Sequence, residues 1–268
     1  MNNPALSRRT FIQQSAAVAG LAGLTANSVA ASSAEGGASA QKPMKIVCVG
    51  GHPDDPESAC AGSLARYSEL GHEVTVIYLT RGERGIKSMA LDDAARIRSG
   101  EAEAACKIMG AKAVFAGQID GATELSRAHV EAFAKLLAVE TPDIVFTHWP
   151  IDTHLDHQIA SLLTQRAAAT LAKRPQIYFF EVNTGSQSQG FTPNTYVDVS
   201  AVVEKKKAAL FAHTSQDGER IWRDHHEPVA KFRGREAGVE WAEAFVHLNR
   251  DNKLGALPGV AAIPMGRP

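Results

Sequence analysis

Apolar and polar positions follow two alternating periods along the chain from about residue 44. Short apolar runs predict strands at 44–50, 73–79, 113–116, 143–147 and 176–182. Between them, apolar residues at helical spacing predict helices at 57–70, 92–109, 126–139 and 157–171. This order indicates an α/β fold, Rossmann-like and mostly parallel, with helices on both faces of the sheet.

The C-terminal third is less regular. We expect one further strand at 195–199 and a helix at 201–213, followed by a loose tail from Gly255. No repeat and no change in composition marks a second domain, so residues 44–268 form a single predicted domain.

The first thirty residues predict an export signal rather than part of the fold. Ser7 to Ile12 read SRRTFI, a twin-arginine pattern, and an Ala/Gly/Leu/Val stretch and small residues at 28–30 follow. The stretch is shorter than the roughly 20 apolar residues of a membrane span. We therefore expect residues 1–30 to be a signal peptide, 31–43 a flexible leader, and the twin-arginine machinery a partner. The mature protein would be periplasmic or extracellular.

Charge and cysteine content narrow the function further. The 268 residues carry a formal net charge of -1, which gives no electrostatic case for nucleic acid as a partner. Three cysteines do not form a disulfide scaffold. Their apolar contexts predict buried small residues, with a single disulfide in an oxidising compartment as the alternative.

Two clusters of polar residues follow predicted strands. The first, GGHPDDPE at 50–57, offers His52, Asp54 and Asp55 where a strand ends and a helix begins. Asp55 as a plain helix cap before Pro56 is the alternative interpretation. The second cluster, at 147–157, offers His154, Asp156 and His157. In the strand order 3-2-1-4-5 the two preceding strands are neighbours, so the clusters meet. A set of three protein ligands drawn from His and carboxylate, with a fourth position open for water, is typical of catalytic zinc. Fe²⁺ can bind to the same donors.

These motifs give the chain a resemblance to a known family. GGHPDDPE, TRGERG at 80–85, HLDH at 154–157 and AHTSQ at 212–216 occur in the order of the PIG-L or LmbE-like zinc-dependent N-acetylglucosaminyl deacetylases. The resemblance implies an exported hydrolase that removes an N-acetyl group from an N-acetylglucosamine-type glycoconjugate, releasing acetate and an amine.

The resemblance also implies a role for each matching residue. His52, Asp55 and His157 would bind Zn²⁺, and Asp54 would be the general base. His154, in its charged form, would stabilise the oxyanion, with Asp156 orienting it. One departure is Pro56, which stands where many members have Glu, so that Glu57 follows one position later.

Other functions remain as alternatives. A zinc amidohydrolase acting on a non-sugar amide or a thiol-sugar conjugate, or a non-catalytic exported sugar-binding protein, would share the motifs. A dinucleotide-binding domain is disfavoured because GGHPDD lacks the GxGxxG loop. Weaker candidates for contact with substrate are Arg81, Arg84, Trp149, Phe191, His213, Trp222, His225 and His226.

Overall fold

The computed structural model describes residues 42–182, 186–248 and 259. The predicted signal peptide and nearly all of the predicted leader lie outside these residues, as does the predicted C-terminal tail apart from Gly259. No helix in the described part of the chain is long and apolar enough to cross a membrane.

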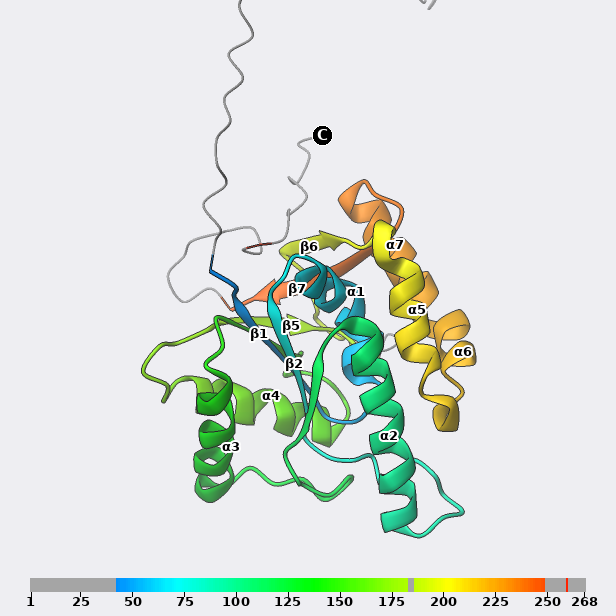
Figure 1. The fold of residues 1–268 in the computed structure, drawn as a ribbon. Coiled ribbons are helices and arrows are strands. Elements are labelled where there is room, and N and C mark those ends of the chain that lie inside the picture. Colours follow the sequence, from blue (N-terminus) through cyan, green and yellow to red (C-terminus); the bar gives the residue numbers. More distant parts are fainter. Residues whose placement is uncertain (1–41, 183–185, 249–258, 260–268) are drawn as a thin grey trace, which may run out of the picture. The chain divides into compact units, whose positions relative to one another are not determined.

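One seven-stranded sheet with the order β3-β2-β1-β4-β5-β7-β6 forms the centre of the domain (Figure 1). The first five strands are parallel, as predicted, whereas β7 runs antiparallel to both β5 and β6. Their bounds are β1 Lys45–Gly50, β2 Glu73–Tyr78, β3 Lys112–Phe115, β4 Ile144–His148, β5 Gln176–Phe180, β6 Thr195–Asp198 and β7 Ala242–His247. The fold class is therefore confirmed.

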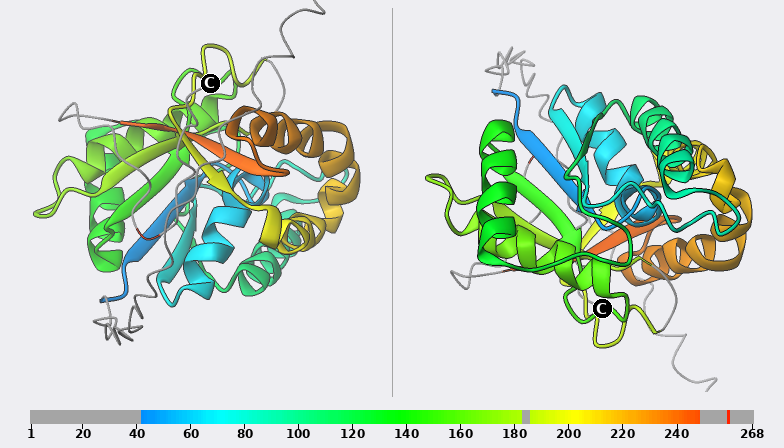
Figure 2. Two further views of the ribbon diagram at one scale, coloured as in Figure 1. Left: turned by 90° about the horizontal axis from the view of Figure 1, so that it is seen from above. Right: turned by 90° about the horizontal axis from the view of Figure 1, so that it is seen from below.

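Helices cover both faces of the sheet, as the two views of Figure 2 show. Successive strand residues point to opposite faces. Ile46 and Cys48 of β1 accordingly pack with α1, α2, α5 and α7, whereas Val47 and Val49 pack with α3 and α4. The helices are α1 Asp55–Glu69, α2 Leu91–Met109, α3 Arg127–Glu140, α4 Leu155–Ala168, α5 Val203–Phe211, α6 Gly218–Ile221 and α7 Glu227–Ala237. Shorter turns of 3-10 or π-helix are η1 Ser200–Val202, η2 Thr214–Gln216 and η3 Trp222–His226.

Helix α7 and strand β7, near the C-terminus, are among the elements absent from the expectations above. Helix α7 buries only Ala230 and Gly234, so its apolar signal is too weak to predict it. Strand β7 places a glutamate, Glu243, in the buried interior, which breaks the apolar pattern of a strand. A charged residue at a core position requires a partner that only the fold provides.

Helix α1 begins two residues earlier than the predicted range of 57–70. The helix begins at Asp55, and Asp54, with a φ of 110°, stands just before it instead of Asp55 acting as the cap. Gly50 allows this close approach of strand and helix, because a Cβ there would lie 2.6 Å from Cδ of Pro56. The three cysteines are buried and free, as expected by default.

Candidate active site

Two loops at the carboxyl ends of β1 and β4 form the site. These strands pair in parallel, so their following loops leave the same edge of the sheet. The N–H of Gly51 donates to Nε2 of His148, the last residue of β4, at 2.8 Å. This bond joins the two loops, and it brings together the sequence clusters that are about a hundred residues apart.

The three expected metal ligands lie in a tight triangle. Nδ1 of His52 is 3.2 Å from Oδ2 of Asp55, and Nε2 of His157 is 3.3 Å from each of those two atoms. Ligand atoms of a tetrahedral zinc ion, at bond lengths of about 2.0–2.1 Å, are separated by about 3.3 Å. The donors and their spacing therefore fit a small divalent cation.

Further carboxylates hold the two histidines from behind. Oδ2 of Asp152 lies 2.9 Å from Nδ1 of His157, and Oδ2 of Asp156 lies 3.0 Å from Nε2 of His52. A carboxylate keeps the proton on the facing nitrogen and leaves the other nitrogen free for a metal. Burial lowers the pKa of His157, but Asp55 and Asp152 raise it overall to about 9.

The contact of Asp156 corrects one expectation. Its carboxylate was expected to orient His154, but it accepts from the N–H of Gly121 and the hydroxyl of Thr123 and contacts His52. Asp156 points into the domain from the first turn of α4, whereas His154 precedes that helix and lines the cavity. The carboxylate of Asp156 thus orients His52, one of the expected metal ligands.

The surroundings of His154 favour its neutral form, whereas the sequence-based hypothesis uses the charged form. Its Nδ1 accepts the backbone N–H of Asp156 at 3.2 Å, which only a neutral imidazole can do. Burial, followed by the charge of His157, lowers the pKa of His154. In the neutral form the proton would be on Nε2, so the ring would still offer an N–H donor.

Asp54 is held by a buried arginine. Nη2 of Arg98, which is 3% exposed, lies 2.9 Å from Oδ2 of Asp54 and also donates to the carbonyl of Pro53. Burial raises the pKa of Asp54, and Arg98 opposes this rise. Behind Asp54, its N–H donates to Glu57, which is fully buried and also accepts from the hydroxyl of Tyr78. These bonds fix the carboxylate despite its left-handed backbone.

A cavity of about 360 Å³ opens beside these groups. It is lined by His52, Asp54, Arg84, Gly85, Arg98, Asp120, His154 and Gln216. Nε of Arg84 donates to the carbonyl of Asp120, so its guanidinium lies at the wall of the cavity. This position is compatible with a contact to substrate. The cavity is large enough to admit a sugar-sized group next to the triangle.

Sequence reasoning assigned no role to four supporting residues. Asp120 lies 3.3 Å from Nε2 of His52, Asp152 supports His157, and Arg98 supports Asp54. His148 is fully buried, and burial lowers its pKa to about 4, which suits its role as an acceptor for Gly51. His148 and Asp152 lie within the predicted cluster at 147–157, and Arg98 matches the resemblance to the family, whereas Asp120 carried no signal in the sequence.

The remaining weak candidates divide by location. His213 is fully buried, with Nε2 3.4 Å from Oε1 of Glu57, and so lies behind the site rather than at its rim. Trp149 and Phe191 pack against each other with ring centroids 5.6 Å apart. Trp222 and His226 are buried, the latter beside a second, smaller cavity described below. Arg81 pairs with Glu83 at 3.2 Å.

Comparison with known proteins identifies the family. The PIG-L family model, described as GlcNAc-PI de-N-acetylase, matches residues 47–168. The diacetylchitobiose deacetylase of Thermococcus kodakarensis is 28% identical over 218 residues, covering 74% of this chain and 81% of the relative. An uncharacterised deacetylase of Escherichia coli is 30% identical over 190 residues, covering 66% of this chain and 94% of the relative.

One solved structure aligns with this chain over almost the whole length of the solved protein. The 4-carboxy-2-hydroxymuconate hydratase of Pseudomonas putida aligns with a TM-score of 0.72 and 25% identity, covering 79% of this chain and 99% of that chain. The family match spans β1 to the end of α4, the segment that contains every residue of the triangle. The chain therefore belongs to the PIG-L family of metal-dependent deacetylases, enzymes that hydrolyse amides.

Proposed function

We propose that this protein is a zinc-dependent N-deacetylase that removes an acetyl group from an N-acetylglucosamine-type glycoconjugate. The observation that carries the proposal is the triangle of His52, Asp55 and His157, with Asp54 and His154 lining the cavity beside it. The deacetylase of Thermococcus kodakarensis, named for diacetylchitobiose, supports the substrate class. Fe²⁺ would suit the same ligands.

A bound zinc ion would supply a water with a pKa near 7 in place of about 16. Asp54, held by Arg98, takes the proton of the attacking water at its carboxylate. The Nε2–H of His154 donates to the carbonyl oxygen as negative charge develops there. Asp54 then returns the proton to the departing nitrogen, so acetate and a free amine leave the site.

Export through the twin-arginine pathway is a separate proposal that rests only on the sequence of residues 7–30, with its twin-arginine pattern, apolar stretch and small residues. An exported enzyme would act on glycans of the cell envelope or outside it. We expect the full chain to accumulate in the periplasm of a host with this pathway, and a variant with both Arg8 and Arg9 changed to Lys to remain in the cytoplasm. Equal distribution of the two proteins would contradict export.

The first experiment measures metal content and acetate release on N-acetylglucosamine, diacetylchitobiose and larger N-acetylated glycans. We expect about one zinc per chain and acetate from at least one substrate, whereas Asp54→Ala keeps the metal and loses at least 100-fold in kcat. Metal binding without release of acetate from any sugar would overturn the substrate class.

Two further arms separate the alternatives. A panel of simple acetamides and thiol-sugar conjugates tests hydrolysis of other amides, and loss of absorbance of an unsaturated tricarboxylate tests the hydration performed by the Pseudomonas putida relative. A protein that binds sugars with unchanged affinity after Asp54→Ala, and hydrolyses none, would be a binding protein.

A further inference from the structure

Helix α1 contains a break between the site and the rest of the helix. Cys60 has a φ of -141° and a ψ of 16°, which are not helical angles. In an unbroken helix the N–H of Gly62 would donate to the carbonyl of Ser58. The turn before the break carries Asp55 and Glu57, so the break sets the direction of the segment that holds the site.

A buried ion pair bonds to the backbone on both sides of this break. Oε1 and Oε2 of Glu243, on β7, accept from the N–H groups of Gly62 and Ser63 at 2.9 and 2.8 Å. Nζ of Lys206, on α5, donates to the carbonyl of Ser58 at 2.7 Å. The two side chains are joined at 2.6 Å, which completes a chain of bonds from Gly62 through the pair to Ser58.

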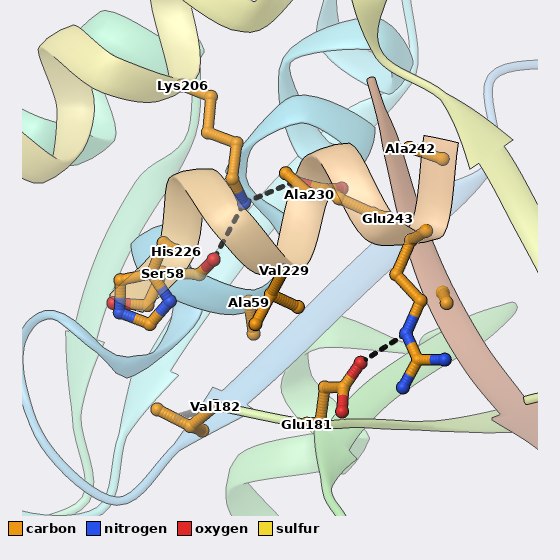
Figure 3. Close-up of a pocket in the computed structure, with 12 residues that line it drawn as sticks. Ser58, Ala59, Glu181, Val182, Lys206, His226, Val229, Ala230, Ala242 and Glu243 are labelled. Atoms are coloured by element: carbon orange, nitrogen blue, oxygen red, sulfur yellow. Dashed lines mark hydrogen bonds and ion pairs between the residues drawn. The ribbon is translucent and has the colours of Figure 1, made fainter. Parts of the chain in front are cut away.

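Figure 3 shows this arrangement, with dashed lines leaving the ammonium group of Lys206 for Ser58 and Glu243. The side chains of Lys206 and Glu243 are each 2% exposed, so the charges are shielded from water. Gly62 makes room for Val199 and for the carboxylate, because a Cβ there would lie 2.6 Å from Cγ1 of Val199 and 3.1 Å from Oε1 of Glu243. The adjoining cavity, of about 20 Å³, holds no more than a water molecule, so it is no ligand site.

We propose that Lys206 and Glu243 are positioning residues that fix the first turn of α1, and thereby hold Asp54 and Asp55 in line with His52 and His157. The pair does not line the cavity of the site. Its effect passes through the backbone of α1, because Nζ of Lys206 lies 2.7 Å from the carbonyl oxygen of Ser58 and 3.4 Å from that of Glu57. This inference rests on one part of the proposed function, the binding of a metal ion by His52, Asp55 and His157. It does not depend on the identity of the substrate.

The same region offers a matched control. Arg233 and Glu181 form a second ion pair at 2.6 Å, 11% and 10% exposed, which lines the same small cavity. Among the hydrogen bonds of the described residues, none links this pair to the backbone of α1. Replacing Arg233 and Glu181 removes a comparable ion pair but leaves the hydrogen bonds at the break in α1 in place.

The test compares two double variants, Lys206→Met with Glu243→Gln and Arg233→Met with Glu181→Gln. Changing both partners leaves no charge without its partner in the interior. We expect the first variant to bind zinc about 10- to 100-fold more weakly in competition with a chelator and to lose kcat by a similar factor, with KM changed less than threefold. The second variant should stay within about twofold of wild type in both quantities.

Hydrogen exchange on the metal-free proteins gives a readout that needs no activity. Backbone amides at 57–63 should exchange at least tenfold faster in the Lys206/Glu243 variant than in wild type, and at the wild-type rate in the Arg233/Glu181 variant. If the first variant does not fold, Glu243→Asp keeps the charge but shortens the reach to Gly62, and we expect the same changes at smaller size.

Unchanged zinc affinity and exchange in a folded Lys206/Glu243 variant would overturn the inference. Equal losses in both double variants would do so as well, because they would indicate general destabilisation. A wild-type protein that binds zinc but deacetylates no sugar would contradict the proposed substrate instead, and would leave the zinc and exchange comparisons intact.

Discussion

Asp152 determines how His157 presents its metal-binding nitrogen. One of its oxygens accepts from Nδ1 of His157, and the other accepts the N–H of His154 at 2.7 Å. Sequence reasoning reached His157 because its spacing from His154 is visible in the chain. It gave Asp156 the wrong partner, because adjacency in sequence says little about which way a helical side chain points.

Replacing Asp152 by Asn should weaken metal binding about 10- to 100-fold, since an amide holds the His157 tautomer less firmly than a carboxylate. The measurement is the zinc dissociation constant by chelator competition. Asp93→Asn, at a 59% exposed side chain of α2, is the control and should leave that constant unchanged. An unaltered zinc dissociation constant in Asp152→Asn would show that the contact between Asp152 and His157 has no influence on metal binding.

Arg98 contacts Asp54, the proposed general base, rather than a proposed metal ligand. We expect Arg98→Lys to lower kcat about tenfold or more, because an ammonium cannot bond at once to Asp54, Pro53 and Gly82 as the guanidinium does. Zinc content should not change. Arg96→Lys, on the exposed side of the same helix, should have the activity of wild type. Loss of zinc from Arg98→Lys would instead indicate that the ligand loop itself had moved.

At the scale of elements, the junction of β1 and α1 tolerates no side chain at Gly50. We expect Gly50→Ala to destabilise the fold by about 1–3 kcal/mol, because its Cβ would overlap the ring of Pro56. Gly100→Ala is the matched substitution in α2, where no atom lies within 4 Å of the new Cβ, and it should stabilise by about 0.5–1 kcal/mol. Denaturant unfolding of both variants measures this, and a stable Gly50→Ala would refute the steric argument.

The elements also show where prediction from sequence stops. The five parallel strands and α1 to α4 follow from clear apolar periodicity, so the order of the sheet and the meeting of the two loops could be predicted. Strand β7 could not, because Glu243 is made acceptable in the core by Lys206, a residue 37 positions away. The outer carboxylate Asp120 likewise follows β3 in a loop without apolar periodicity, and its contact with His52 depends on the path of that loop.

For the whole molecule, buried neutral histidine links stability to pH. Burial, followed by the charge of Lys206, lowers the pKa of His226 to about 3. In the unfolded chain its pKa is about 6.5, so between these values the unfolded state binds the additional proton. Stability therefore rises with pH across this window and is lost as the pH falls.

We expect the free energy of unfolding of wild type to fall, between pH 6 and pH 4, by up to about 1.4 kcal/mol per pH unit more than that of His226→Gln. The control is His129→Gln, whose side chain is 37% exposed and which should follow wild type. Parallel pH curves for wild type and His226→Gln would contradict the assignment of a neutral buried ring.

The separation of the two ligand loops has a consequence for assembly. His52 and His157 are 105 positions apart and meet only when β4 has paired with β1. A nascent chain in which α4 has not yet been synthesised contains only two of the three ligands. It cannot bind the ion tightly, because the site does not exist before the chain folds. Metal uptake therefore reports that β4 has paired with β1, which precedes the addition of β5, β7 and β6 in chain order or accompanies it. The ion then ties the first strand to the second half of the domain and resists their separation.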